Sequence, residues 1–224
     1  PIFQQRIMTD FVAKLDEKSI PYAFLDSNWP EFSPITFYGQ DSIRSGEFSA
    51  RIMTMASGGN PKRLFLFKIL GEGRVASRQQ LNRERGFRQY LADNCPKCEI
   101  VDVNLYAYDK QGMREIMREA FAENPDVRLG VSFNSSIHLI GDFLRTEMPE
   151  HPHVTLLGYD MLEANVRCVK QGFVDFLIAQ HPHKQGLNCF RSMFNTCVLH
   201  SKPTRDHYVS IELLTKENID YYED

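Results

Sequence analysis

The sequence has no apolar run long enough to cross a membrane and no continuous run of basic residues. A membrane-spanning helix needs about 20 consecutive apolar residues, so no membrane segment is expected. Lysine and arginine occur in runs no longer than a pair, and the net charge is −3. Proteins that hold nucleic acid by themselves usually carry a basic patch, so these residues alone are not expected to bind DNA.

Cysteines are also few, and their number is odd. Five scattered cysteines make a poor disulfide framework and are typical of a reducing cytoplasm, where we expect this protein to be. Cys95 and Cys98 form a Cys-x-x-Cys pair, but no second pair and no His-x-x-x-His motif supplies the other ligands of a zinc site. We interpret the pair as a turn with two free thiols.

Other signs of metal, cofactor or nucleophile chemistry are weak. Gly71-Glu-Gly73 lacks the third glycine and the Lys-Ser/Thr of a P-loop, so it is interpreted as a plain turn. Ser135 and Ser136 do not lie in a Gly-x-Ser-x-Gly motif. Five histidines without supporting ligands are expected to be exposed loop residues, namely His138, His151, His153, His181 and His183. We therefore expect no metal, no cofactor and no enzymatic activity.

What the sequence does contain is a regular alternation of strand and helix patterns in a globular composition, with 42% hydrophobic residues. Helices are expected over residues 5–18, 42–56, 78–93, 112–122, 136–147, 162–170 and 183–199. Strands are expected over 20–25, 35–38, 63–69, 100–105, 129–133, 154–159, 173–178 and 208–213. This alternation predicts an α/β fold whose parallel sheets are covered by helices on both faces.

Polar side chains stand where several of these strands end. Asp26, Asn134, Asp160 and Gln180 each follow an apolar strand. Ligands of parallel α/β sheets bind beyond the carboxyl ends of the strands, so these side chains are candidates for one site. Carboxylates accept hydrogen bonds and amides both donate and accept, which suits a ligand with many hydroxyl groups.

Three further residues complete this hypothesis. Arg83 offers a planar fork of donors, and Tyr108 and Trp29 offer flat faces on which a sugar ring could stack. The alternative for each residue alone is an ordinary helix cap, strand end or packing position. The set as a whole favours a polyhydroxylated ligand.

An ordered series of motifs resembles the effector-binding region of the lactose-repressor (LacI/GalR) family, which shares its fold with periplasmic sugar-binding proteins. The resemblance runs along the whole chain, although Ser135 replaces the aspartate that usually follows the asparagine. Trp29 has no clear counterpart in the family. The motifs are Ile20-Pro-Tyr-Ala-Phe-Leu-Asp26, Asp41-Ser-Ile-Arg-Ser-Gly46, Arg83-Glu-Arg-Gly-Phe87, Val131-Ser-Phe-Asn134, Leu157-Gly-Tyr-Asp160, Ile178-Ala-Gln180 with Gly186, and a closing strand from Val209 similar to that of repressors from Bacteroides-type bacteria.

The resemblance implies a two-lobed fold and a set of ligand contacts. The N-terminal lobe would comprise 1–37 and 181–209, and the C-terminal lobe 38–180 and 210–224. Ligand contacts are implied for residues at strand ends, in one helix and at the lobe crossover, namely Asp26, Phe37, Arg83, Tyr108, Asn134, Asp160 and Gln180.

The first lobe resembles only part of its counterpart in the family. The helix-turn-helix DNA-binding domain, the hinge and the first strands have no match, and we interpret Pro1 as a fragment boundary. A lobe without its first strands would expose apolar surface and a sheet edge. Either a longer natural chain or self-association would cover that surface.

The expected function is therefore binding of a sugar or related effector by a regulator that acts as a homodimer. Closure of the lobes on the effector would control operator binding through the DNA-binding domain outside this chain. The alternative is a sugar-binding protein or sensor domain of the same fold for transport or signalling. An α/β enzyme that uses Asp26 or Asp160 as acid or base is the second alternative.

Overall fold

The computed structural model describes residues 5–71, 77–203 and 205–224, so most of the Gly71–Gly73 turn lies outside the described residues. The helices are α1 (Gln5–Glu17), α2 (Ser42–Ala56), α3 (Arg78–Asn94), α4 (Lys110–Glu123), α5 (His138–Glu147), α6 (Glu163–Lys170), α7 (Pro182–Cys197) and the 3-10 turn η1 (Ile219–Tyr221). The strands are β1 (Ala23–Leu25), β2 (Thr36–Gly39), β3 (Arg63–Leu70), β4 (Glu99–Tyr106), β5 (Leu129–Val131), β6 (Thr155–Tyr159), β7 (Phe176–Ala179), β8 (Asp206–Tyr208) and β9 (Glu212–Leu214).

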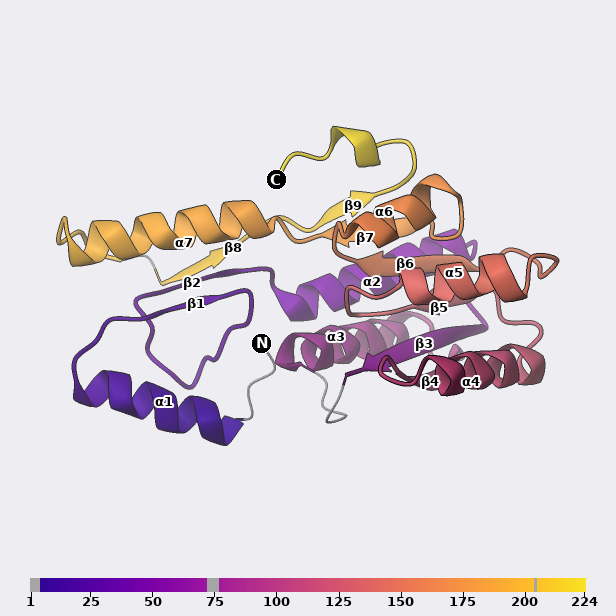
Figure 1. Cartoon of the computed structure of the whole chain (residues 1–224), viewed down its shortest axis with the longest axis horizontal. Helices are drawn as coiled ribbons and strands as arrows, with labels where there is room; N and C mark the ends of the chain where they lie inside the picture. Colours follow the sequence, from indigo (N-terminus) through magenta and orange to yellow (C-terminus); the bar gives the residue numbers. More distant parts are fainter. Residues whose placement is uncertain (1–4, 72–76, 204) are drawn as a thin grey trace.

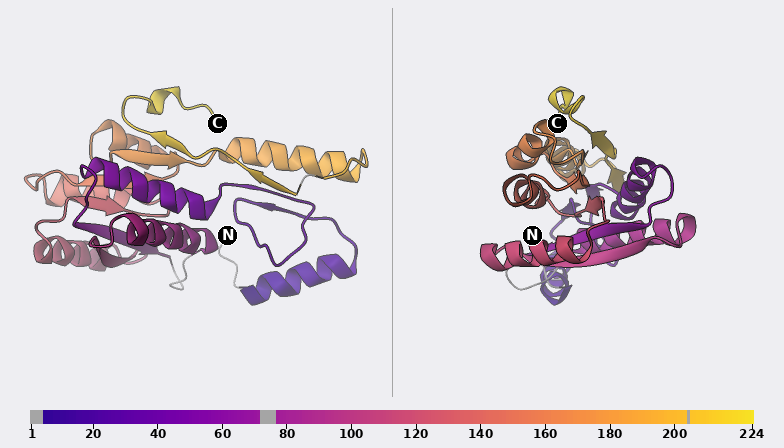
Figure 2. Two further views of the ribbon diagram at one scale, coloured as in Figure 1. Left: turned by 180° about the vertical axis from the view of Figure 1, so that it is seen from behind. Right: turned by 90° about the vertical axis from the view of Figure 1, so that its right-hand side faces the viewer.

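The strands form two separate sheets, which lie along the long axis of the molecule (Figures 1 and 2). The small sheet has the order β1-β2-β8, and the large sheet has the order β4-β3-β5-β6-β7-β9. All pairs are parallel except β7 with β9. The α/β fold predicted from the sequence is confirmed. We call the small sheet with α1 and α7 the small lobe, and the large sheet with α2 to α6 and β9 the large lobe.

The large lobe has a core on each face of its sheet. Strand side chains from β3 and β5 to β7 pack against α4, α5 and α6 on one face and against α2 and α3 on the other. Helices α2 and α3 make close backbone contact at Gly46 and Gly86, where an added Cβ would collide with the carbonyl oxygens of Arg83 and Ile43. This contact determines where the first turns of α3 stand relative to the sheet.

The small lobe has a much smaller core. It consists of Met8 and Val12 of α1 with Phe24, Trp29 and Phe37. Trp29 is therefore a packing residue, and the guanidinium carbon of Arg78 lies 4.8 Å from the centre of its ring. Apolar side chains stay exposed on both helices of this lobe, including Ile7, Phe11, Leu187, Phe190 and Phe194. The sequence analysis expected exposed apolar surface in this lobe on the premise that its first strands are missing.

One expected strand is wrong, because the chain between residues 206 and 214 enters both sheets. β8 pairs with β2 of the small sheet, whereas β9 pairs with β7 of the large sheet. Between them, the Val209 amide donates to the Gly39 carbonyl at 2.9 Å before the chain crosses over. The continuous strand expected over 208–213 is thus two short strands. Across the described ranges, no helix combines the length and apolarity of a membrane span.

Candidate ligand-binding site

The two lobes are connected by three chain crossings, at Gln40, at residues 180–181 and at residues 209–211. The side chain of Gln40 is 2% exposed and holds all three together. Its Nε2 donates to the carbonyl oxygens of Ala179 and Ser210, both at 3.1 Å, and its Oε1 accepts from Ser45 Oγ at 2.9 Å. The crossings therefore form one hydrogen-bonded hinge.

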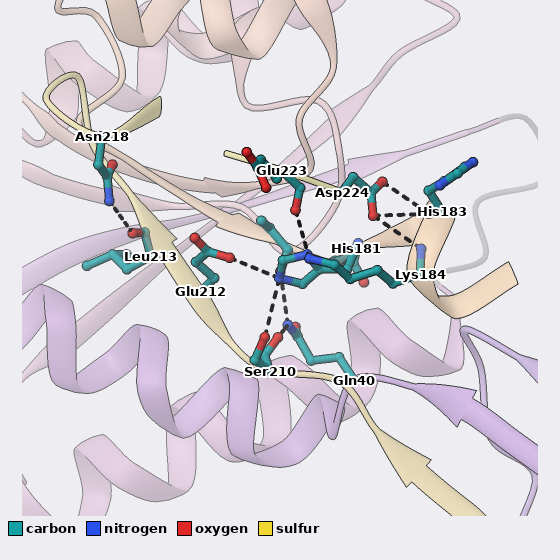
Figure 3. Close-up of polar contacts among 12 residues, drawn as sticks. Gln40, His181, His183, Lys184, Ser210, Glu212, Leu213, Asn218, Glu223 and Asp224 are labelled. Atoms are coloured by element: carbon teal, nitrogen blue, oxygen red, sulfur yellow. Dashed lines mark hydrogen bonds and ion pairs between the residues drawn. The ribbon is translucent and has the colours of Figure 1, made fainter. Parts of the chain in front are cut away.

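His181 lies inside this hinge, where the sequence analysis expected an exposed loop residue (Figure 3). It is 3% exposed, has a left-handed backbone with φ of 52°, and its ring stands 5.2 Å from that of Tyr222. Its Nε2 lies 3.0 Å from a carboxylate oxygen of Glu212. The prediction for His181 is wrong because residues distant in the sequence cover the ring.

The C-terminal residues close the same region (Figure 3). The carboxylate of Asp224 accepts from the backbone amides of His183 at 3.0 Å and Lys184 at 3.4 Å, at the start of α7. Lys184 Nζ donates to the Glu223 carbonyl at 2.8 Å. An acid at a helix N-terminus satisfies free amides and suits the helix dipole, so these contacts attach the chain end to the small lobe.

Beside the hinge, four of the predicted residues meet in one hydrogen-bond network. Gln180 is buried and lies at its centre: its Oε1 accepts from an Arg83 Nη, and its Nε2 donates to Asp160. Gln79 supplies the remaining link, since its Nε2 lies 2.9 Å from Gln180 Oε1 and 2.8 Å from Asp26 Oδ1. The network thus reaches from the end of β1 in the small lobe to the end of β6 in the large lobe.

Both aspartates of the network stand where the chain turns sharply away from a strand. Asp26 and Asp160 have positive φ angles of 68° and 73°. Asparagine and aspartate adopt this left-handed conformation more readily than most residues, which suits them to these positions. The turns leave the two carboxylates at the strand ends that face the other lobe.

Arg83 is the most deeply buried charge of the site, with 1% of its surface exposed. One guanidinium nitrogen donates to the Phe133 carbonyl at 2.9 Å, and the guanidinium carbon lies 3.9 Å from the centre of the Tyr159 ring. Burial lowers the pKa of Arg83, while the nearby Tyr159, Asp160 and Asp26 oppose this change. Arginine remains charged at neutral pH, so the site contains a fixed cation.

Asp160 carries the matching negative charge in a poorly solvated position. Burial raises the pKa of its carboxyl above the usual range, although the hydrogen bond from Gln180 and the charge of Arg83 lower it in part. Burial disfavours the charged form of an acid, and polar partners restore it only partly here. A bound hydroxyl group that donates to Asp160 would supply further stabilisation.

A cavity of about 300 Å³ opens next to this network, between the lobes. Asp26 and Gln79 form part of its wall, and Phe37 and Tyr208 supply aromatic rings whose centres are 5.9 Å apart. Arg85 and Asn82 of α3 also line it, whereas Arg83, Asp160 and Gln180 lie behind its wall and are not among its lining residues. Phe37, predicted at the lobe crossover, is therefore a wall of this cavity and a member of the small-lobe core.

Two predicted residues, Asn134 and Tyr108, stand outside both the network and this cavity. The Asn134 side chain donates to the Ile69 carbonyl at 2.7 Å and accepts from the Ser136 amide at 3.1 Å, and it lines a neighbouring cavity of about 370 Å³. Tyr108 is 52% exposed, and its ring lies 5.9 Å from that of Tyr106. Among the described residues, neither side chain is hydrogen-bonded to Gln180.

Sequence reasoning missed two residues of the site. Gln79 lies in the first turn of α3, within the Ser77–Gln80 capping box, and one turn before Arg83. That spacing places both side chains on the same side of the helix and was an available signal. Tyr159 directly precedes Asp160, but nothing in its position indicates that its ring lies against Arg83.

The interpretation of the histidines as exposed loop residues is also wrong for His138, which is half-buried and begins α5, while His183 is exposed but lies in α7. The interpretation of the cysteines agrees with the structure. All five cysteines are free, and the Cys98 amide donates to the Cys95 carbonyl at 2.8 Å, which confirms a turn with two free thiols. Burial raises the pKa of the Cys98 thiol to about 11. Within the described part of the chain, no group of histidine, cysteine and carboxylate side chains could hold a metal ion.

Comparison with solved structures finds similar folds in a transcriptional regulator and in sugar-binding proteins. A protein from Bacteroides fragilis assigned as a LacI transcriptional regulator has a TM-score of 0.91 and 38% sequence identity. The alignment covers 100% of this chain and 76% of the Bacteroides fragilis chain. GanP, a glucose-galactose binding protein from Geobacillus stearothermophilus, has a TM-score of 0.78 and 17% identity, covering 94% of this chain and 74% of its own. A solute-binding protein from Burkholderia graminis, in complex with D-arabinose, has a TM-score of 0.81 and 16% identity, covering 95% and 73%.

Comparison of the sequence with curated proteins gives no significant match. The family model described as the periplasmic binding protein domain matches residues 3–197. This match spans both strands of the small lobe that precede the hinge and the network around Gln180. The chain belongs to the periplasmic binding protein domain family.

Proposed function

We propose that this chain is the effector-binding region of a LacI-family transcription regulator and that its effector is a sugar or a related metabolite. The relationship to the Bacteroides fragilis protein, at 38% identity over the whole of this chain, supports a regulator. The proposal includes binding without catalysis, a cytoplasmic location and a homodimer. DNA would be bound by a helix-turn-helix domain that is not among these residues.

The observation that carries the sugar-binding proposal is the network centred on Gln180. It combines two carboxylates, two amides and one guanidinium next to an aromatic-walled cavity between lobes. Acceptors and donors that alternate along a surface match sugar hydroxyls, which are donors and acceptors at once. The charged members make the stronger hydrogen bonds, and the aromatic rings can cover an apolar sugar face.

The proposed mechanism is a shift between open and closed lobes. Asp26 belongs to the small lobe, whereas Arg83 and Asp160 belong to the large lobe, so a ligand that contacts all three stabilises the closed form. A ligand shifts this equilibrium only by its difference in affinity for the two forms. Couplings of about 1–3 kcal/mol would change operator affinity several-fold to a hundred-fold.

The first test is a thermal shift screen of the protein with D-galactose, D-glucose, D-arabinose, D-tagatose, sugar acids and sugar phosphates. A ligand at 100 times its Kd stabilises the native state by about 2.7 kcal/mol, which raises the melting temperature measurably. Gln89→Ala, an exposed substitution on α3, serves as the control that should retain every shift. No shift with any compound would contradict sugar binding.

The second candidate is a sugar-binding protein or sensor for transport or signalling. The fold similarity to solute-binding proteins, at TM-scores of 0.78 and 0.81, favours it. Gel-shift measurement with the full-length natural protein and its own upstream DNA distinguishes the two. DNA binding that changes with the sugar supports the regulator, and sugar binding without DNA binding supports the alternative.

A further inference from the structure

Arg83 is a buried cation whose direct hydrogen bonds go to neutral groups. Its two terminal nitrogens donate to the Phe133 carbonyl and to Gln180 Oε1, and its Nε has no partner among the described residues. Within the described part of the chain, Gln180 is the hydrogen-bonded link between Arg83 and the Asp160 carboxylate. A buried charge without a directly paired carboxylate is costly, so another group must stabilise it.

The ring of Tyr159 occupies the position of that group. It is fully buried, and the Arg83 guanidinium carbon lies 3.9 Å from the ring centre. A cation above the face of an aromatic ring is attracted by the ring's quadrupole, and the attraction is strongest where water is excluded. The ring also blocks the guanidinium from that side.

The hydroxyl group of Tyr159 holds the ring in place. It lies 2.7 Å from Ser49 Oγ and 3.0 Å from Ser45 Oγ, and it donates to the Ser45 carbonyl at 3.1 Å. Both serines belong to α2, which contacts the backbone of Arg83 at Gly46. The ring and its target are thus attached to the same pair of helices.

We infer that Tyr159 is a positioning residue, whose ring holds the Arg83 guanidinium in the plane from which it binds Gln180, at the centre of the network beside the cavity. The inference rests on the proposed function for the ligand, whereas the stacking of the two side chains is measurable without one. Tyr159 itself need not contact the ligand. Its conservative replacement Tyr159→Phe keeps the ring face and loses only the hydroxyl contacts.

The decisive measurement is NMR of arginine Nε–H groups in protein labelled with ¹⁵N-arginine and without ligand. Protons above an aromatic ring are shifted upfield, so the Arg83 resonance, identified by its loss in Arg83→Lys, should lie upfield of the other arginines. Arg63, which pairs with Glu99 and Asp126, provides the internal reference for an ion-paired side chain. Tyr159→Phe should retain the upfield position and Tyr159→Leu should lose it. An Arg83 resonance at the ordinary position in the unmodified protein would overturn the inference, whether or not Tyr159→Leu folds.

Titration with the best-binding sugar of the screen gives the second readout. Tyr159→Leu should weaken binding about tenfold to thirtyfold, and Tyr159→Phe should restore affinity to within about threefold of the unmodified protein. Equal losses in both variants would show that the hydroxyl contacts, and not the ring face, matter. If no sugar binds the unmodified protein, the proposed function fails while the NMR result still decides the role of Tyr159.

Discussion

Gln79 donates its side-chain amide to Asp26 at 2.8 Å, and this hydrogen bond connects the large lobe to the small lobe. The same Nε2 lies 2.9 Å from Gln180 Oε1. Gln79 therefore makes side-chain contacts with residues on both sides of the boundary between the lobes. A bound sugar would have to replace these contacts or add to them.

Replacing Gln79 with alanine should loosen the contact between the lobes. A hydrogen bond to a carboxylate contributes about 1.5–3 kcal/mol, and a partly exposed one contributes less. We expect the ligand-free protein to lose about 1 kcal/mol of stability in urea unfolding. Gln89→Ala on the exposed side of α3 should change stability by less than about 0.5 kcal/mol. Equal stabilities of the two variants would show that the Gln79–Asp26 bond does not connect the lobes.

Gln40→Ala should destabilise the hinge more strongly. This variant removes one hydrogen-bond partner from each of three groups, the carbonyls of Ala179 and Ser210 and the hydroxyl of Ser45. An unsatisfied buried polar group lowers the free energy of unfolding by about 1–3 kcal/mol. We expect a loss of about 3 kcal/mol, with faster amide hydrogen exchange at the crossings. The exposed Gln111→Ala on α4 is the matched control. Unchanged exchange at residues 179–181 would count against the hinge described here.

Two helical glycines should respond to alanine in opposite ways. A Cβ at Gly46 meets the Arg83 backbone, so Gly46→Ala forces α2 and α3 apart and should cost about 3 kcal/mol. A Cβ at Gly186 in α7 meets no atom within 4 Å, so Gly186→Ala should stabilise by about 0.5–1 kcal/mol through helix propensity. Melting temperatures of both variants test this. Similar values for the two would refute the role of Gly46 in placing Arg83.

The raised pKa of Asp160 predicts a pH dependence of ligand affinity. Because the folded-state pKa lies above the unfolded value, this carboxyl costs stability at neutral pH, and the cost disappears as the pH falls and the group is protonated. If ligand binding needs the charged Asp160 carboxylate, ligand affinity should fall as the pH is lowered. The fall should begin at a pH above the usual range of aspartate pKa values. Asp160→Asn should abolish this dependence, bind about tenfold to a hundredfold more weakly at neutral pH, and melt no lower than the unmodified protein. Calorimetric titrations between pH 4 and about pH 7.5 measure the dependence. An unchanged pH profile in the variant would contradict the assignment.

Thiol reactivity should follow burial. Cys197 is exposed, whereas burial raises the pKa of Cys98 and Cys168 to about 11. The thiolate is the reactive form, so Cys197 should react first with a thiol reagent at pH 8, and Cys98 and Cys168 much later. Cys197→Ser should remove the fast phase. Loss of titratable thiols in pairs would instead indicate disulfides.

Much of the fold follows from local patterns. Asp41 precedes α2 and accepts from the amides of Ile43 and Arg44, as its position before an apolar-periodic segment predicts. The lobe boundaries implied by the family resemblance divide the chain between residues 209 and 210, but no local pattern predicts the division of residues 206–214 between two sheets. It depends on pairing with β2 and β7, which lie far away in the sequence and leave no local pattern.

The hydrogen-bond network of the candidate site was predictable where its residues follow strands, and less so elsewhere. Asp26, Asp160 and Gln180 follow strands and meet in one network with Arg83. Gln79 follows no strand, and its role depends on how α3 is placed by Gly46. The burial of His181 depends on Glu212 and Tyr222, which only the folded chain brings close.

The central claim is that a sugar binds between the lobes, in contact with residues of both. The most direct test is calorimetric titration of the best-binding sugar against the unmodified protein, Asp26→Asn in the small lobe and Asp160→Asn in the large lobe. We predict at least about tenfold weaker binding in each variant, since each loses a hydrogen bond to a charged acceptor. Affinities unchanged in both variants would contradict the account, because the sugar would then bind elsewhere.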